Sequence, residues 1–159
     1  MITVYNILNN NNLPALNPVI ELDIEGKDVS IENSVNILNE YFQMDKLNVE
    51  HAYLIGFNNT MDIVGIFLIS IGNSKKCFFY KKSIGTFLLL SGTEKFILYH
   101  NHPDGNLEPS NDDIVSTMYI KSLADILEVE FIDSVIISKN GWYCINGGQG
   151  CEYDEEDTI

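Results

Sequence analysis

The chain has 159 residues, of which 9 are basic and 23 are acidic, so its formal net charge is −14. All the basic residues are lysines, whereas tight binding to duplex nucleic acid draws on clustered Lys and Arg, so direct nucleic-acid binding is not expected. An apolar content of 45% and this length suit one soluble globular domain rather than two.

The N-terminal part of the chain predicts two strands and a helix. We expect the strands at residues 2–7 and 19–24, with an Asn-rich loop around residues 9–12 between them. Ser30 is expected to cap a helix that ends near Met44, because a serine hydroxyl can accept a hydrogen bond from the first helical turn.

The middle of the chain contains three apolar runs that we predict to be strands, at residues 50–57, 63–71 and 77–80. Asn58 and Asn59 separate the first two runs. Because asparagine tolerates left-handed backbone, this pair suits a hairpin turn. The next helix, over residues 84–90, is expected to end at Gly92. The remaining elements are a strand at 95–100, a polar loop at 101–108, a helix from Ser110 to about Leu127, and strands at 131–138 and 142–145.

These elements predict a single layered domain of the α/β (α+β) class, in which a mixed β-sheet is flanked by helices. No apolar run approaches the roughly 20 residues that span a bilayer, and the N-terminus does not resemble a signal peptide. The three cysteines include no C-x-x-C pair, which argues against a disulfide framework and a cysteine-type zinc finger. A cytoplasmic location is therefore expected, without membrane attachment.

One polar segment carries the residue types of a metal site, in the pattern H-x-H, seven residues, then S-x-x-D. In a strand, residues i and i+2 point to the same face, so His100 and His102 can direct their imidazoles to one point. Ser110 and Asp113 lie three residues apart at a helix start and therefore on one side of its first turn. Two imidazoles and one carboxylate can hold Zn²⁺ with its fourth tetrahedral position open. Asn101 points to the opposite face, and we expect it to anchor the loop.

Each half of this pattern also has a purely structural interpretation. A lone H-x-H is often incidental, and Ser110 with Asp113 is a plausible helix cap. Their joint occurrence in a chain with only three histidines favours a metal site. Other families with H-x-H fit less well, because a zinc deaminase needs H-x-E and P-C-x-x-C and amidohydrolase barrels need a longer chain.

The H-N-H-P run at residues 100–103, with S-x-x-D at residues 110–113, resembles the JAMM (MPN+) metalloprotease signature in the form typical of its RadC-like branch. The similarity extends from about residue 50 to residue 138. It implies an MPN/JAB-like fold with layering like that of cytidine deaminases. The implied parts are N-terminal strands and a helix that pack onto the core (1–49), the RadC-like JAB/MPN catalytic domain (50–146) and an acidic C-terminal tail (147–159).

The resemblance also implies a glutamate from an earlier strand as general base. We choose Glu50, which opens a predicted strand where the resemblance places this glutamate. Glu108 lies nearer to the ligands in sequence and stays an alternative, although a flexible loop positions a base poorly. Glu94 could share a strand face with His100, but six residues of strand put it roughly 20 Å away.

The leading hypothesis is a zinc-dependent peptidase or isopeptidase that hydrolyses an amide bond of a peptide or protein substrate with a zinc-activated water. The metal ligands would be His100, His102 and Asp113. Glu50 would transfer the proton of the water to the leaving amine, and Ser110 would donate a hydrogen bond to the oxyanion. The alternatives are a noncatalytic or accessory RadC-like protein in DNA repair or maintenance, and a zinc-stabilised binding module.

Overall fold

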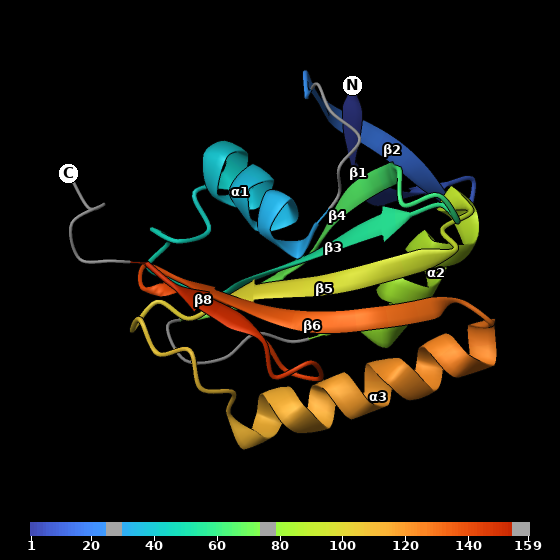
Figure 1. Ribbon diagram of the computed structural model, residues 1–159. Helices are drawn as coiled ribbons and strands as arrows, with labels where there is room; N and C mark the ends of the chain where they lie inside the picture. The colour runs from blue at the N-terminus through green and yellow to red at the C-terminus, as the bar shows by residue number, and fades with distance from the viewer. Residues whose placement is uncertain (25–29, 74–78, 154–159) are drawn as a thin grey trace.

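In the computed structural model, which describes residues 1–24, 30–73 and 79–153, one mixed sheet of eight strands is flanked by three helices (Figure 1). The strand order is β2-β1-β4-β3-β5-β6-β7-β8, in which β1–β4 and β5–β6 are the parallel pairs. The predicted layered α+β domain is confirmed. In chain order the elements are β1 (Ile2–Asn10), β2 (Leu13–Leu22), α1 (Ile31–Phe42), β3 (His51–Phe57), β4 (Ile63–Ile71), α2 (Lys81–Ser91), β5 (Lys95–Asn101), α3 (Asn111–Leu127), β6 (Glu130–Ser138), β7 (Gly141–Cys144) and β8 (Gly150–Glu152).

The two faces of the sheet carry separate apolar cores, because successive side chains of a strand point to opposite faces. Tyr99 of β5 packs on the face that Leu38 of α1 covers. Its neighbour Leu98 packs on the other face, with Phe87 of α2 and Ala124 of α3. The sheet is thus a middle layer, with α1 on one side and α2 and α3 on the other (Figure 1).

The N-terminal strands form one long hairpin, which the sequence did not predict. Asn11 and Asn12 make a two-residue turn with positive φ angles of 50° and 65°, a backbone that asparagine tolerates. The predicted strands at residues 2–7 and 19–24 were therefore wrong in extent, and the expected Asn-rich loop is a tight turn. Both prolines of β2 are accommodated because β2 lies at the edge of the sheet.

Three further elements differ from their predictions. Within the predicted strand at 77–80, the first two residues lie outside the described part of the chain, and Phe79 and Tyr80 belong to no strand. These two residues lead into α2, which begins at Lys81 rather than at residue 84. Near the C-terminus, β8 pairs with β7 inside the segment predicted as a tail, although all three of its residues are exposed.

The predicted helix ends are largely confirmed. The hydroxyl of Ser30 accepts a hydrogen bond from the N–H of Asn33 (3.1 Å), although α1 ends two residues before Met44. Gly92 follows α2 in a left-handed conformation with φ of 67°. In the β3–β4 hairpin the residue with positive φ is Met61, rather than either asparagine of the predicted turn.

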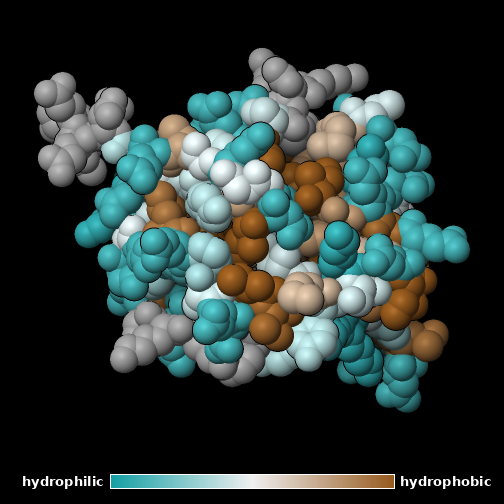
Figure 2. Space-filling model, turned by 60° about the horizontal axis from the view of Figure 1, so that its bottom comes forward, coloured by the Kyte–Doolittle hydropathy of each residue, from teal (hydrophilic) through white to brown (hydrophobic). Residues whose placement is uncertain are grey.

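Helix α3 is buried on one side only. Thr117, Ile120 and Ala124 face the sheet, whereas Met118 and Tyr119 are exposed. Figure 2, turned so that the bottom of Figure 1 comes forward, shows apolar side chains interspersed with hydrophilic ones on the face that it presents. Among the described helices, none combines the length and the apolar character needed to cross a membrane.

Candidate metal centre

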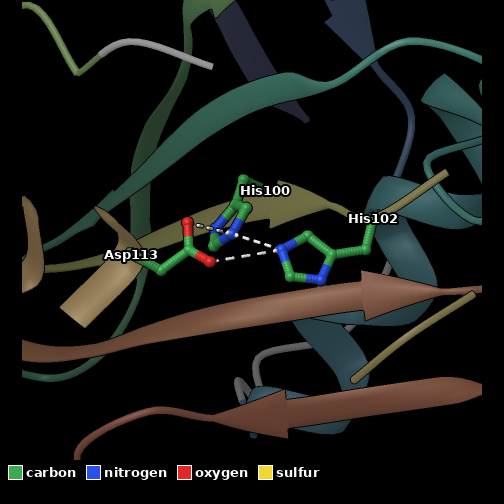
Figure 3. Close-up of side chains that lie close together, drawn as sticks. All are labelled: His100, His102 and Asp113. Carbon is green, nitrogen blue, oxygen red and sulfur yellow. Dashed lines mark hydrogen bonds and ion pairs between the residues drawn. The ribbon is translucent and has the colours of Figure 1, made fainter. Parts of the chain in front are cut away.

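Three side chains from two elements converge at the start of α3, as Figure 3 shows. Nε2 of His100 lies 3.1 Å from Oδ1 of Asp113 and 3.2 Å from Nε2 of His102. Nε2 of His102 lies 3.4 Å from Oδ2 of Asp113. The three residues predicted as metal ligands are therefore brought together.

The two elements place these groups for simple geometric reasons. His100 is the last side chain of β5 on the face covered by α2 and α3, and His102 follows it two residues later on the same face. Ser110 is the N-cap of α3 and forms a capping box with Asp113. Its hydroxyl donates to Oδ2 of Asp113 at 2.6 Å, so the predicted helix cap also orients a predicted ligand.

The spacing of the three groups fits a tetrahedral metal ion. Metal–ligand bonds of about 2.0–2.1 Å at tetrahedral angles put neighbouring ligand atoms roughly 3.3 Å apart. Nε2 of His100 lies close to this distance from both Nε2 of His102 (3.2 Å) and Oδ1 of Asp113 (3.1 Å), and one ligand atom from each of the three residues lies within 4.8 Å of the other two. Two imidazoles and a carboxylate are also a donor set that zinc accepts in catalytic sites, where an open position remains.

The imidazole rings are held by their surroundings. Nδ1 of His102 lies 2.9 Å from the carbonyl of Asn106, which can only accept, so this nitrogen carries the proton and leaves Nε2 for a metal. Phe79 packs edge-on against the ring of His100, with 5.8 Å between ring centroids. The sequence did not indicate either partner, because one contact is made by a main-chain carbonyl and the other by an ordinary apolar side chain.

The charges at this point favour a cation. Burial alone would raise the pKa of Asp113, but hydrogen bonds from His100, His102 and Ser110, together with the charge of His100, hold it well below its ordinary value. Burial alone would lower the pKa of His102. The hydrogen bond and charge of Asp113, together with the Asn106 carbonyl and the charge of Glu50, raise it instead. A proton or a metal ion is therefore stabilised between these groups.

Glu50 lies directly before β3 and lines the same pocket as His102 and Asp113. The β3–β5 register explains this placement, because Ala52 pairs with His100 and two further antiparallel steps bring Glu50 opposite His102. Glu50 is 8% exposed, so the protein covers most of its surface. The predicted base is thus near the predicted ligands.

The two other glutamates weighed as bases lie differently. Glu108 is exposed and lines the pocket from the loop before α3. Glu94 lies at the far end of β5, where its N–H donates to the carbonyl of Phe57 at 2.9 Å. This position agrees with the prediction that Glu94 lies too far from His100 to act as the base.

The pocket beside the three ligands has a volume of about 890 Å³. Its wall combines aromatic side chains, such as Tyr80 and Tyr119, with the acidic Asp104 and Asp112. This volume lies within the roughly 300–1,000 Å³ of small-molecule pockets.

Residues 30–150 match the family described as the RadC-like JAB domain. The chain belongs to this family. A UPF0758 protein of Chlorobium phaeovibrioides is 30% identical over 94 residues, which are 59% of this chain and 42% of the relative. A UPF0758 protein of Thermotoga maritima is 24% identical over 121 residues, 76% of this chain and 54% of the relative. This RadC-like JAB domain thus spans about half the length of the curated relatives that it matches.

The resemblance seen in the H-N-H-P and S-x-x-D motifs is therefore confirmed at the level of the family. The matched segment contains α1, the three converging ligands and Glu50. The N-terminal hairpin of β1 and β2 lies before it.

Proposed function

We propose that this RadC-like JAB domain is a zinc-dependent metallopeptidase or isopeptidase that hydrolyses an amide bond. The observation that carries the proposal is the convergence of two imidazoles and a carboxylate, 3.1–3.4 Å apart, beside a pocket that Glu50 also lines. His100, His102 and Asp113 would hold the ion. When bound there, zinc would supply Lewis-acid chemistry, lowering the pKa of a water toward about 7 and polarising the scissile carbonyl.

Glu50 is proposed as the proton-transferring group. Its carboxylate accepts the proton of the attacking water as the water oxygen adds to the carbonyl carbon. The same proton is then delivered to the amide nitrogen as the C–N bond breaks, so that the products are a carboxylic acid, which keeps the second proton of the water, and an amine. The position of Glu50 in the wall of the pocket that His102 and Asp113 also line supports this role, because a general base must lie within reach of the attacking water.

Ser110 is proposed to serve two roles in sequence. Its hydroxyl donates to Asp113 at 2.6 Å and so orients a ligand. During the reaction the hydroxyl donates instead to the oxyanion, a contribution of about 3 kcal/mol for one such donor. The main-chain N–H of Ser110 donates to the same oxygen of Asp113 at 2.8 Å, so the ligand keeps one hydrogen bond when the hydroxyl turns.

The proposal is tested by loading the purified protein with zinc and incubating it with a library of linear and lysine-branched peptides. Mass spectrometry should detect new termini in one of the two classes, and the active class identifies the bond. Chelation should abolish cleavage and added zinc should restore it. If the protein binds about one zinc per chain but cleaves neither class of peptide, the proposal is contradicted. The remaining alternative would then be a zinc-stabilised binding module.

A further inference from the structure

Asn101 is the last residue of β5 and separates His100 from His102, and its side chain lies on the opposite face of the strand. It is 1% exposed. Its Nδ2 donates to the carbonyl of Val49 at 3.1 Å, and its Oδ1 accepts from the N–H of His51 at 2.6 Å. We expected Asn101 to anchor the loop after β5, but it anchors the segment that enters β3.

Through these two hydrogen bonds Asn101 holds both peptide groups that flank Glu50. The Val49 carbonyl and the Glu50 N–H belong to one peptide group, and the Glu50 carbonyl and the His51 N–H belong to the next. On the other side of the strand, the Glu50 N–H donates to the carbonyl of Asn73 at 2.9 Å and the Glu50 carbonyl accepts from Gly72 at 2.7 Å. Each peptide plane is therefore held from both sides, which fixes the main chain at Glu50 and the direction of its Cα–Cβ bond.

A side chain performs this task because the main-chain pairing of β3 with β5 ends at Ala52 and His100. Beyond that pair β5 stays hydrogen-bonded to β6, where the N–H of His102 donates to the carbonyl of Ile137 at 2.9 Å, and the next residue, Pro103, has no N–H. The amide of Asn101 continues the ladder for one more step, with a donor and an acceptor in place of the missing backbone groups.

We propose that Asn101 is a positioning residue, whose amide fixes the main chain from which the Glu50 side chain extends and so places the Glu50 carboxylate relative to His100 and His102. The proposal rests on the proposed function only for the chemical role of Glu50. The site requires a donor for the Val49 carbonyl and an acceptor for the His51 N–H. Asparagine meets this requirement because its short side chain ends in an amide that carries both groups. Aspartate has the same shape but presents an acceptor to the Val49 carbonyl, and leucine presents neither group.

The first experiment compares crystal structures of the zinc-loaded wild type, Asn101→Leu and Asn101→Asp. We expect His100, His102 and Asp113 to keep their places in all three proteins and zinc affinity to change by no more than about threefold. In both variants the Glu50 carboxylate should move or become disordered. An unmoved Glu50 in a folded variant overturns the proposal, and Asn101→Asp serves if Asn101→Leu does not fold. This readout needs no substrate, so a failure of the proposed function is recognised separately.

The second experiment is a double-mutant cycle on peptide cleavage. A misplacement of about 1 Å can cost roughly 100-fold in rate, so Asn101→Leu should lower kcat by about that factor with little change in KM. In a Glu50→Gln background the same substitution should have no further effect. A loss of equal size in both backgrounds, or a loss confined to KM, would overturn the positioning role.

Asn58 provides the matched control, because it lies at the other end of β3. Its Oδ1 accepts from the N–H groups of Thr60 and Asp62 at 3.0 and 2.8 Å and so orders the β3–β4 turn. Asn58→Leu should lower the melting temperature and leave both kcat and the position of Glu50 unchanged. If Asn58→Leu lowers kcat as much as Asn101→Leu does, the effect is one of general stability and the proposal fails.

Discussion

The two parts of the candidate site are held in different ways. His100, His102 and Asp113 are directed at one another, with their ligand atoms 3.1–3.4 Å apart. Glu50 is held through its main chain. On one side its N–H and carbonyl are hydrogen-bonded to residues 73 and 72, and on the other side the amide of Asn101 is hydrogen-bonded to the neighbouring residues Val49 and His51.

This difference suggests that the ligands depend on a cation and Glu50 does not. Three electron-rich atoms converge between the histidines and Asp113, so a proton or a metal ion must balance them. Both main-chain groups of Glu50 are hydrogen-bonded without an ion. Changes at the ligands should therefore act first on metal binding, whereas changes around Glu50 should act on turnover at full metal content.

The largest effect is expected from a ligand. His100→Ala removes one of the three atoms that would hold zinc, so the affinity should fall by more than the roughly 10–100-fold typical of outer partners. Metal analysis after dialysis should find about one zinc per chain in the wild type and almost none in the variant. His51→Ala is the matched control, because His51 lies outside the ligand group, and this variant should keep its zinc. If His100→Ala retained its zinc, His100 would not be a metal ligand and the proposed difference between the ligands and Glu50 would be wrong.

Ser110 connects the two parts and should give an intermediate effect. Ser110→Ala removes both the helix cap and the hydroxyl, so the free energy of unfolding should fall by about 1 kcal/mol and kcat by about 100-fold. Ser110→Gly loses the same hydroxyl, but glycine costs only a few tenths of a kcal/mol as a cap. Cleavage by Ser110→Gly at the wild-type rate would show that the hydroxyl acts only on the helix.

The smallest effect is the pH dependence of stability. The raised pKa of His102 contributes stability below its ordinary value of 6.5, and this contribution is lost as the pH rises through the raised value. The lowered pKa of Asp113 contributes stability above 3.8 that is lost only in stronger acid. The melting temperature of zinc-free protein should thus fall by roughly 2–4 °C from pH 6 to pH 9 if about 1 kcal/mol is lost.

Zinc should reverse the sign of this dependence, because the metal needs a neutral imidazole. The stabilisation by saturating zinc should therefore grow as the pH rises. Thermal melts of wild type and His102→Gln, with chelator and with zinc, separate His102 from other titrating groups. An identical pH dependence in the two proteins would refute the assignment to His102.

The ligands could be predicted because their geometry is local. The period of a strand places His100 and His102 on one face, and the first turn of a helix places Asp113 beside Ser110. Glu50 is fifty residues away in sequence and was chosen through a family resemblance, since its proximity depends on the β3–β5 register. The contacts of Asn101 with the start of β3 depend on the same register and had no local signal.

The errors in the fold have a similar cause. The hairpin of β1 and β2 was cut short because Asn11 and Asn12 suggest a loop, whereas they form a tight turn with positive φ. β8 has three exposed residues and is paired only through its backbone with β7. Such strands leave no hydrophobic period to detect. Both errors lie outside the elements that carry the site.

The most direct test of a zinc site served by Glu50 is the rate of peptide cleavage by Glu50→Gln and Glu108→Gln, measured against wild type at equal zinc content. We predict that Glu50→Gln loses roughly 10²–10⁴-fold in kcat, the usual contribution of a general base. Glu108→Gln should stay close to wild type, because Glu108 is an exposed loop residue. Wild-type turnover by zinc-loaded Glu50→Gln would contradict the account, and a loss in Glu108→Gln alone would transfer the role of base to Glu108.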